Sequence, residues 1–360
     1  MGATGRMRWI SRGAKRSRRA PAGRRQLRTA VLALLLTSAS LVGASLTWAP
    51  SALAATCEVP AAVTVDRRTD PASTSSNAAT PASNSSIIQI EGEDDDSATP
   101  VSRPVATPVQ SAPDPIVLLA EELTAVSESL AACLSEGDAE MVTQLASERY
   151  LGQLFGSSVT FSREDYLALA SDLTPIPTRI VAVEDVTLST DDRATALVTQ
   201  VVGNQLMRAE WTFELAPPDE RGAGESRWRL ASERQQPVSA PLDSVPIDIE
   251  IGDRSFTLDE TLVAGPDVVL RGSNVSDEDH EMLVLRFTPG YTTADLLRAS
   301  GPDLPQEVTF IGAATVLAGD DGDLVLVDLE PGQYTLVCLF PDQAGTPHLA
   351  QGMEATFTVE

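Results

Sequence analysis

Four side chains near the end of this chain could together bind a soft metal ion. The stretch "CLFPDQAGTPHLAQGM" places Cys338, His348 and Met353 within sixteen residues, and the second histidine of the chain is His280. Thiolate sulfur, thioether sulfur and imidazole nitrogen are ligands that copper and zinc prefer. Each residue alone has a simpler explanation, because a histidine between strands is usually structural and buried cysteine and methionine often only fill a core. The site therefore depends on the fold bringing all four together.

The elements around these residues are almost all strands. Eight segments between 247 and 360 either alternate apolar with polar residues or are apolar throughout, and turn residues separate them. One short helix is predicted over 293–300. This spacing predicts a β-sandwich or Greek-key barrel over 238–360. Cys338 then ends a strand, and "EATFTV" is the strand after Met353, with Ala355, Phe357 and Val359 facing inward. Prolines and glycines let the intervening loop fold back, namely Pro341, Gly345, Pro347 and Gly352.

The order of histidine, then cysteine, histidine and methionine resembles the cupredoxin family. "DLEPGQYTLVCLFPD" looks like the strand that reaches the family's cysteine, "GMEATFTVE" like its closing strand, and "LRGSNVSDEDHEMLVL" like the strand and loop that deliver its first histidine. The resemblance covers residues 243–360. It implies one type 1-like copper ion, held in a His₂Cys set with a weak axial methionine. The implied ligands are His280, Cys338, His348 and Met353.

Two departures from the pattern bear on this expectation. Nine residues separate Cys338 from His348, a longer loop than small blue copper carriers have, although copper nitrite reductases have a comparable one. Asp342 and the acidic run 277–279 add negative charge near a site that is usually apolar, and Glu281 stands where plastocyanin-like proteins often carry asparagine. A cupredoxin fold without metal and a site for zinc or another metal stay open as alternatives. With two histidines in the chain, no second histidine-rich copper cluster exists, so we do not expect oxidase or nitrite-reductase chemistry.

The residue pattern in the middle of the chain predicts an α+β domain over 115–237. Apolar residues at steps of three and four indicate a helix from Ile116 to Cys133, with Cys133 as a core residue. Asp138 is a good N-cap for a second helix running through Tyr150, and Ser162 for a third. The period then changes to two over four segments, which predicts an antiparallel sheet: 179–189, 193–203, 206–216 and 226–235.

The helix–"EGD"–helix opening and the closing strand "SRWRLASER" resemble the NTF2-like (SnoaL-like) family. The resemblance implies a curled sheet around a pocket, which the family uses for enzymes, binding modules and inert scaffolds. Catalytic members usually place a histidine or aspartate in that pocket, and this stretch has no histidine. Acids such as Asp172 and Glu210 are expected on a solvated face. We therefore expect a non-catalytic module for an unidentified small-molecule ligand. Catalysis in this pocket stays open as a third hypothesis, which a ligand found there would support.

The N-terminus reads as an export signal over 1–55. A basic stretch precedes an apolar run and the small residues "SALAAT", and Arg24-Arg25 makes both Sec and twin-arginine export candidates. Residues 56–114 are rich in Ser, Thr, Pro and acids and predict a disordered linker, and 236–246 predicts a shorter second linker. The chain is thus predicted to be multidomain and extracytoplasmic, with no transmembrane segment after signal removal.

The net charge of the chain limits the kinds of partner that it can bind. Ten of the 26 basic residues lie between Arg6 and Arg28, so removal of the signal leaves 16 against 51 acidic residues, a net charge of −35. Such a protein does not bind nucleic acid through a basic patch. We expect a redox partner protein if copper is bound. The rival hypothesis is a metal-free envelope binding or interaction protein built from the same two modules.

Three cysteines leave at least one thiol unpaired within the chain. Export would place them in an oxidising compartment, where Cys57 and Cys133 could pair and leave Cys338 free. The sequence leaves open whether Cys57 is paired, free or lipidated, since the residues before it fit a lipobox poorly.

Overall fold

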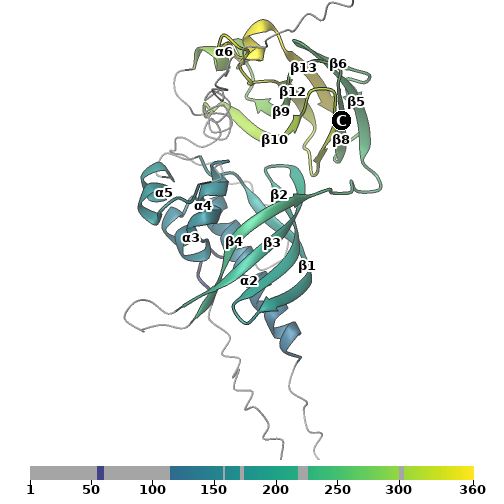
Figure 1. Ribbon diagram of the computed structural model, residues 1–360. Coiled ribbons are helices and arrows are strands. Elements are labelled where there is room, and N and C mark those ends of the chain that lie inside the picture. The colour runs from purple at the N-terminus through teal and green to yellow at the C-terminus, as the bar shows by residue number, and fades with distance from the viewer. Residues whose placement is uncertain (1–54, 61–113, 157–158, 171–173, 218–225, 300–303) are drawn as a thin grey trace, which may run out of the picture.

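A computed structural model describes residues 55–60, 114–156, 159–170, 174–217, 226–299 and 304–360 (Figure 1). The predicted export signal lies outside the described residues except for its last position, and so do residues 61–113 of the linker predicted over 56–114. No helix in the described part of the chain is long and apolar enough to cross a membrane.

The first domain opens with four helices: α2 (Pro115–Glu136), α3 (Ala139–Leu145), α4 (Glu148–Leu154) and α5 (Arg163–Ala170). The side chain of Asp138 caps α3 by accepting a hydrogen bond from the backbone of Met141. The prediction of one helix from Asp138 through Tyr150 is wrong. Ala146 has an extended backbone that bridges to Leu230, and Ser147 caps a new helix. This pairing with a strand far along the chain has no signal in the local sequence.

Four antiparallel strands follow the helices: β1 (Thr178–Thr190), β2 (Arg193–Val202), β3 (Gln205–Ala216) and β4 (Arg227–Gln236). The long helix α2 packs on β1 and β4 (Figure 1). Trp211, Phe213 and Trp228 are fully buried between the sheet and the helices, together with Leu123 and Leu130 of α2. The predicted α+β arrangement is therefore present.

A disulfide joins Cys57 to Cys133 on the buried face of α2, and Cys338 is the free cysteine. Cys57 and Val59 pack against the core of the first domain. The expected linker over 56–114 therefore needs a correction, because residues 55–60 lie against the first domain. The disulfide is the reason, since it fixes this short segment to a helix that begins more than fifty residues later.

The second domain is a β-sandwich, as the sequence predicted. One sheet has the strand order β10-β9-β12-β13-β7, and the other contains β11-β8-β5-β6. Apolar side chains from both sheets fill the space between them. Strand β7 has two residues and was not predicted, because so short a segment shows no periodicity. The elements are β5 (Val245–Gly252), β6 (Ser255–Leu258), β7 (Leu262–Val263), β8 (Val268–Asn274), β9 (His280–Phe287), α6 (Thr293–Arg298), β10 (Val308–Val316), β11 (Asp321–Leu326), β12 (Gly332–Val337), η1 (His348–Gln351) and β13 (Glu354–Val359).

The two domains share one continuous sheet, which the sequence did not predict. Strand β3 pairs with β11 at Gln205 and Leu326, so the sheet runs from β1 to β6 across both domains. The turn between β2 and β3 adds backbone hydrogen bonds, from Asn204 to Ile311 and from Val327 to Asn204. Four buried valines from the two domains also pack together in this interface: Val201, Val269, Val325 and Val327. The domains therefore meet through a built interface and not only through the segment between β4 and β5.

Gly203 packs closely against the second domain at this interface. It has a positive φ of 62°, and a β-carbon there would lie 3.0 Å from the carbonyl oxygen of Ile311 and 3.1 Å from that of Phe310. Gly203→Ala should therefore lower the free energy of unfolding by about 1–2 kcal/mol more than a matched control does. Gly319→Ala is that control, since Gly319 also has a positive φ but nothing within 4 Å of the added carbon. Urea unfolding of both variants measures this difference. Equal losses of the free energy of unfolding would contradict the close packing of Gly203 at the interface.

Candidate metal centre

Three buried side chains converge in the second domain. Nδ1 of His348 lies 3.1 Å from Nδ1 of His280, and Sγ of Cys338 lies 3.5 Å from the first and 3.8 Å from the second. A metal ion with bonds of about 2.0 Å to nitrogen and 2.3 Å to sulfur in a trigonal plane needs donors roughly 3.5–3.8 Å apart. Within the described residues this is the one group of three or more histidine, cysteine or acidic side chains close enough to hold an ion. Both sulfur–nitrogen distances lie in this range, and the nitrogen–nitrogen distance of 3.1 Å is a few tenths of an ångström shorter, so the donor set fits a type 1-like copper site.

His280 is oriented by a chain of hydrogen bonds. It is the first residue of β9, where it pairs with Val316 of β10. Its Nε2 lies 2.9 Å from Oγ of Ser276, which directs Nδ1 toward the other ligands. The buried Asn274 holds Ser276 by accepting from both its backbone N–H and its hydroxyl, at 3.0 and 2.8 Å. A second ring nitrogen fixed in this way is typical of a histidine that binds metal.

Cys338 lies directly after β12, in the core between the two sheets of the sandwich. Its side chain is fully buried, and its sulfur accepts a hydrogen bond from the backbone N–H of Glu281 at 3.4 Å. Its own backbone bonds to Met353 on one side and Leu349 on the other, with N–O distances of 3.4 and 2.8 Å. The thiol is thus held by strands β9 and β12 and by the segment that carries the other two predicted ligands.

The nine-residue loop between Cys338 and His348 is a closed hairpin. Asp342 accepts hydrogen bonds from the backbone N–H groups of Ala344 and Thr346 at 2.8 and 2.9 Å, which closes its tip. The backbone of His348 then donates to Phe340 at 2.9 Å. The hairpin therefore returns His348 to a position beside Cys338 in spite of its length.

Met353 comes next along the chain and is fully buried. The short helix η1 ends at Gly352, whose φ of 93° reverses the chain, and Met353 donates its backbone N–H to the carbonyl of His348 at 3.1 Å. The structure thus places all four predicted residues in one region and brings three of them within ligand distance of one another.

Burial sets the protonation of the donors. Desolvation, together with the nearby His348, lowers the pKa of His280 to about 4, and desolvation also lowers the pKa of His348. Desolvation raises the pKa of the Cys338 thiol to about 12. At neutral pH both imidazoles are therefore neutral and ready to bind, and a metal ion has to displace only the thiol proton.

Glu281, the residue after His280, is an acid inside the protein and not on its surface. Its carboxyl group is buried, and desolvation raises its pKa to about 8. A hydrogen bond from the backbone of Leu339 opposes this rise only in part. The group is therefore mostly protonated at pH 7. Nothing in "DHEMLVLRF" distinguishes a buried glutamic acid from one at a loop edge, so the sequence carried no signal for it.

Replacing Glu281 with glutamine tests this assignment in the metal-free protein. Above pH 4.5 the unfolded chain releases the proton that the folded protein keeps until about pH 8, so this group lowers the free energy of unfolding as pH rises through that window. Glutamine does not ionise, and Glu281→Gln should therefore be more stable than the parent by about 2–4 kcal/mol at pH 8 and nearly equal to it at pH 5.

Urea unfolding at several pH values between 5 and 8 measures this gap. The two histidines are common to both proteins, so their titration cancels in the comparison. The exposed Glu354 provides the matched control, as Glu354→Gln. A constant gap between Glu281→Gln and the parent across the pH range would contradict a buried, protonated Glu281.

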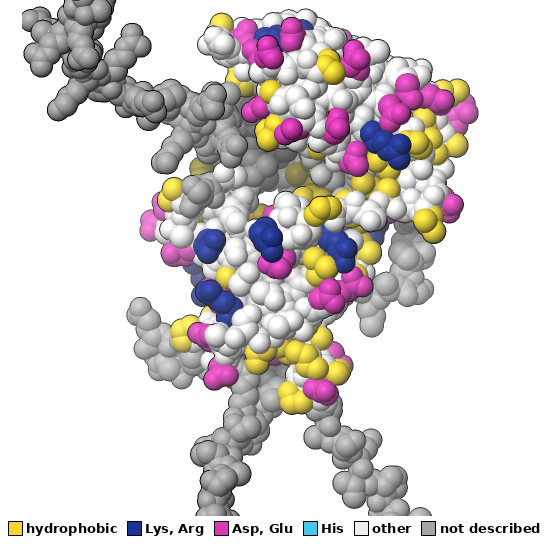
Figure 2. Space-filling model, turned by 45° about the vertical axis from the view of Figure 1, so that its right-hand side comes forward, with side chains coloured by type: hydrophobic (Ala, Val, Ile, Leu, Met, Phe, Trp, Pro, Cys, Tyr) yellow, Lys and Arg dark blue, Asp and Glu magenta, His cyan; other side chains and the backbone are white. Residues whose placement is uncertain are grey.

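The metal cluster is separated along β10 from the contacts that the first domain makes with this strand. His280 pairs with Val316 at the end of β10, whereas the first domain contacts Ile311 and Ala313. Acidic side chains are spread over the second domain on the face shown in Figure 2, and no histidine is visible there, which agrees with the burial of both.

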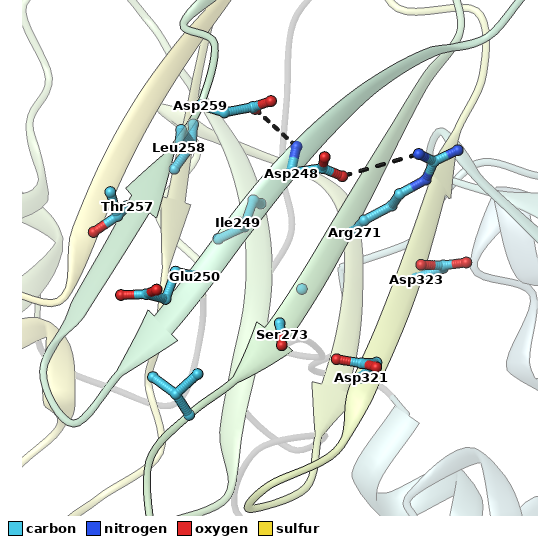
Figure 3. Close-up of a pocket in the computed structure, with 12 residues that line it drawn as sticks. Asp248, Ile249, Glu250, Thr257, Leu258, Asp259, Arg271, Ser273, Asp321 and Asp323 are labelled. Atoms are coloured by element: carbon cyan, nitrogen blue, oxygen red, sulfur yellow. Dashed lines mark hydrogen bonds and ion pairs between the residues drawn. The ribbon is translucent and has the colours of Figure 1, made fainter.

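A shallow cavity of about 580 Å³ lies elsewhere on the second domain, over the outer face of β5, β6, β8 and β11 (Figure 3). Five acidic side chains and Arg271 border it, and none of the metal-cluster residues does. In the first domain, Glu210 is about two-fifths exposed and pairs with Arg234, so it is the surface acid that the sequence predicted. Asp172 lies outside the described residues.

Comparison with known proteins finds no matching family model and no matching curated protein. Among solved structures, dithionite-reduced auracyanin from Roseiflexus castenholzii matches 32% of this chain and 98% of its own, at 25% identity and a TM-score of 0.25. Auracyanin B matches 34% of this chain and 94% of its own, at 22% identity and a TM-score of 0.25. The McoA multicopper oxidase from Aquifex aeolicus matches 44% of this chain and 41% of its own, at 12% identity and a TM-score of 0.22.

Proposed function

We propose that this protein is an exported, cupredoxin-like copper protein that transfers electrons or handles copper outside the cytoplasm. The observation that carries the proposal is the triangle of buried donors formed by His280, His348 and Cys338. Two imidazoles and one thiolate are the donor set that suits copper in both of its common oxidation states. Bound there, copper would supply one-electron redox chemistry.

The chain's own residues prepare the site in three ways. Ser276 orients His280, the backbone of Glu281 donates to the cysteine sulfur, and the closed hairpin sets His348 in place. Burial keeps both imidazoles neutral at pH 7 and excludes water from the three donors. Met353 would be the fourth ligand, which is supported by its burial and by its backbone contacts with Cys338 and His348.

The first domain is proposed to be a non-catalytic NTF2-like module. Its helices and curled antiparallel sheet support that assignment, as does the absence of histidine from residues 115–237. The export signal predicted over 1–55 supports a location outside the cytoplasm, and the disulfide between Cys57 and Cys133 agrees with an oxidising compartment. A redox partner protein would follow from electron transfer.

Optical titration of the purified protein with Cu(II) tests the copper proposal. We expect an intense thiolate-to-copper charge-transfer band that saturates at one copper per chain, with the stoichiometry checked by elemental analysis. The rival function, a metal-free interaction protein, predicts no such band and no retained metal after removal of excess copper. That second result would overturn the proposal.

A further inference from the structure

The outer edge of His348 is covered by an ion pair. Nε2 of His348 lies 3.4 Å from Oε2 of Glu278, and the same carboxylate oxygen accepts a hydrogen bond from Arg254 at 2.7 Å. Glu278 and Arg254 are themselves 36% and 28% exposed in their side chains, whereas the side chain of His348 is 2% exposed. On this side, therefore, a single layer of side chain separates the ring of His348 from solvent.

This ion pair also ties three separate segments of the chain together. Arg254 comes from the turn between β5 and β6, and Glu278 from the loop between β8 and β9. The Nε–H of Arg254 donates at 2.8 Å to Gln351, at the end of η1. Gln351 in turn donates at 3.0 Å to Asp342, the residue that closes the tip of the hairpin. The guanidinium group thus holds both the cover over His348 and the hairpin that carries this ligand.

We infer that the Arg254–Glu278 ion pair is a latch on the metal centre, and that its opening gives solvent and metal ions access to His348. The chemistry of the partners fits this role. A charge-assisted hydrogen bond at a partly exposed position is strong enough to stay closed most of the time and weak enough to open without unfolding the sandwich. The side chain of His280, by contrast, has its second nitrogen on the buried Ser276 and has no such cover to open.

The inference deepens the proposed function and rests on it for the metal, but the latch can be tested without copper. Diethyl pyrocarbonate acylates neutral imidazole, and the chain has only two histidines, one under the latch and one away from it. In the metal-free protein, mass spectrometry of the peptides that contain His280 and His348 gives a separate rate of modification for each.

We expect Arg254→Gln and Glu278→Ala each to raise the rate at His348 by about tenfold, the factor that one charge-assisted hydrogen bond represents, and to leave the rate at His280 unchanged. Arg271→Gln is the matched control. Arg271 is an exposed arginine of the same domain, it is 3.9 Å from its partner Asp248, and it lies on the outer sheet face shown in Figure 3. This control should keep the parent rate at both histidines.

Release of copper from the loaded protein to a chelator provides the second readout, and it should also be about tenfold faster in the two latch variants than in the control. A rate at His348 that stays at the parent value in both latch variants would overturn the latch. Faster modification of both histidines, together with loss of the near-ultraviolet circular dichroism, would identify a variant that has unfolded. The rate at His348 in the other variant then decides whether the ion pair is a latch. A parent protein that binds no copper would overturn the proposed function, while the rates of modification would still report on the latch.

Discussion

Replacing Cys338 with serine is expected to abolish the charge-transfer band and to lower the affinity for Cu(II) by more than about 100-fold. Loss of a partner that merely orients a ligand already costs about 10–100-fold in metal affinity, and Cys338 is the donor whose sulfur makes the site suit copper. Serine is nearly the same size and replaces a side chain that is fully buried. The variant should therefore fold and keep His280 and His348 in place.

Val337→Ala provides the control for this substitution. Val337 precedes Cys338, is equally buried, and contributes no donor atom. Its truncation perturbs the packing at the same end of β12, yet the copper band should remain. A competition titration against a chelator of known affinity measures both variants. A Cu(II) affinity of Cys338→Ser within about threefold of the parent's would contradict the role of the thiol as a ligand.

Breaking the disulfide between Cys57 and Cys133 should destabilise the first domain by about 4 kcal/mol. The bond closes a loop with a sequence separation of 76 residues, and the entropy of the unfolded chain that such a cross-link removes corresponds to roughly 4 kcal/mol at 25 °C. Cys57→Ser is the cleaner of the two single substitutions. Cys57 is only half-buried, whereas Cys133 lies in the core, where its thiol can remain as a small apolar residue.

Urea unfolding followed by tryptophan fluorescence measures this loss, because Trp211 and Trp228 both lie in the core of the first domain. Val59→Ala is the control, since it trims the packing of the same segment and keeps the disulfide. A loss of less than about 1 kcal/mol in Cys57→Ser would contradict the stabilising role of the bond. The copper band should survive in both variants, because the metal centre lies in the other domain.

Most of the secondary structure could be predicted because it depends on local pattern. Alternation of apolar residues identifies strands such as "EATFTV", and helix caps such as Asp138 and Ser162 are visible as single residues. The errors occurred where a distant partner decides the local conformation. Ala146 breaks a helix to pair with Leu230, and β7 exists only because β13 lies beside it.

The candidate site was predictable in its residues and not in its surroundings. Cys338, His348 and His280 carry chemistry that few other residues can supply, so their types and order were enough to group them. The buried Glu281 and the latch residues Arg254 and Glu278 are common surface types, and their roles follow from contacts between segments about 25 to 100 residues apart in the chain. The pairing of β3 with β11 likewise depends on the folded shape of both domains.

X-ray absorption spectroscopy at the copper edge of the copper-loaded protein tests the central claim most directly, because it reports which atoms bind the metal. The account predicts one short copper–sulfur contact and two copper–nitrogen contacts from imidazole, the set that Cys338, His280 and His348 bring together. It also predicts that Cys338→Ser loses the sulfur contact. A copper ion surrounded only by oxygen and nitrogen in the parent protein would contradict the account.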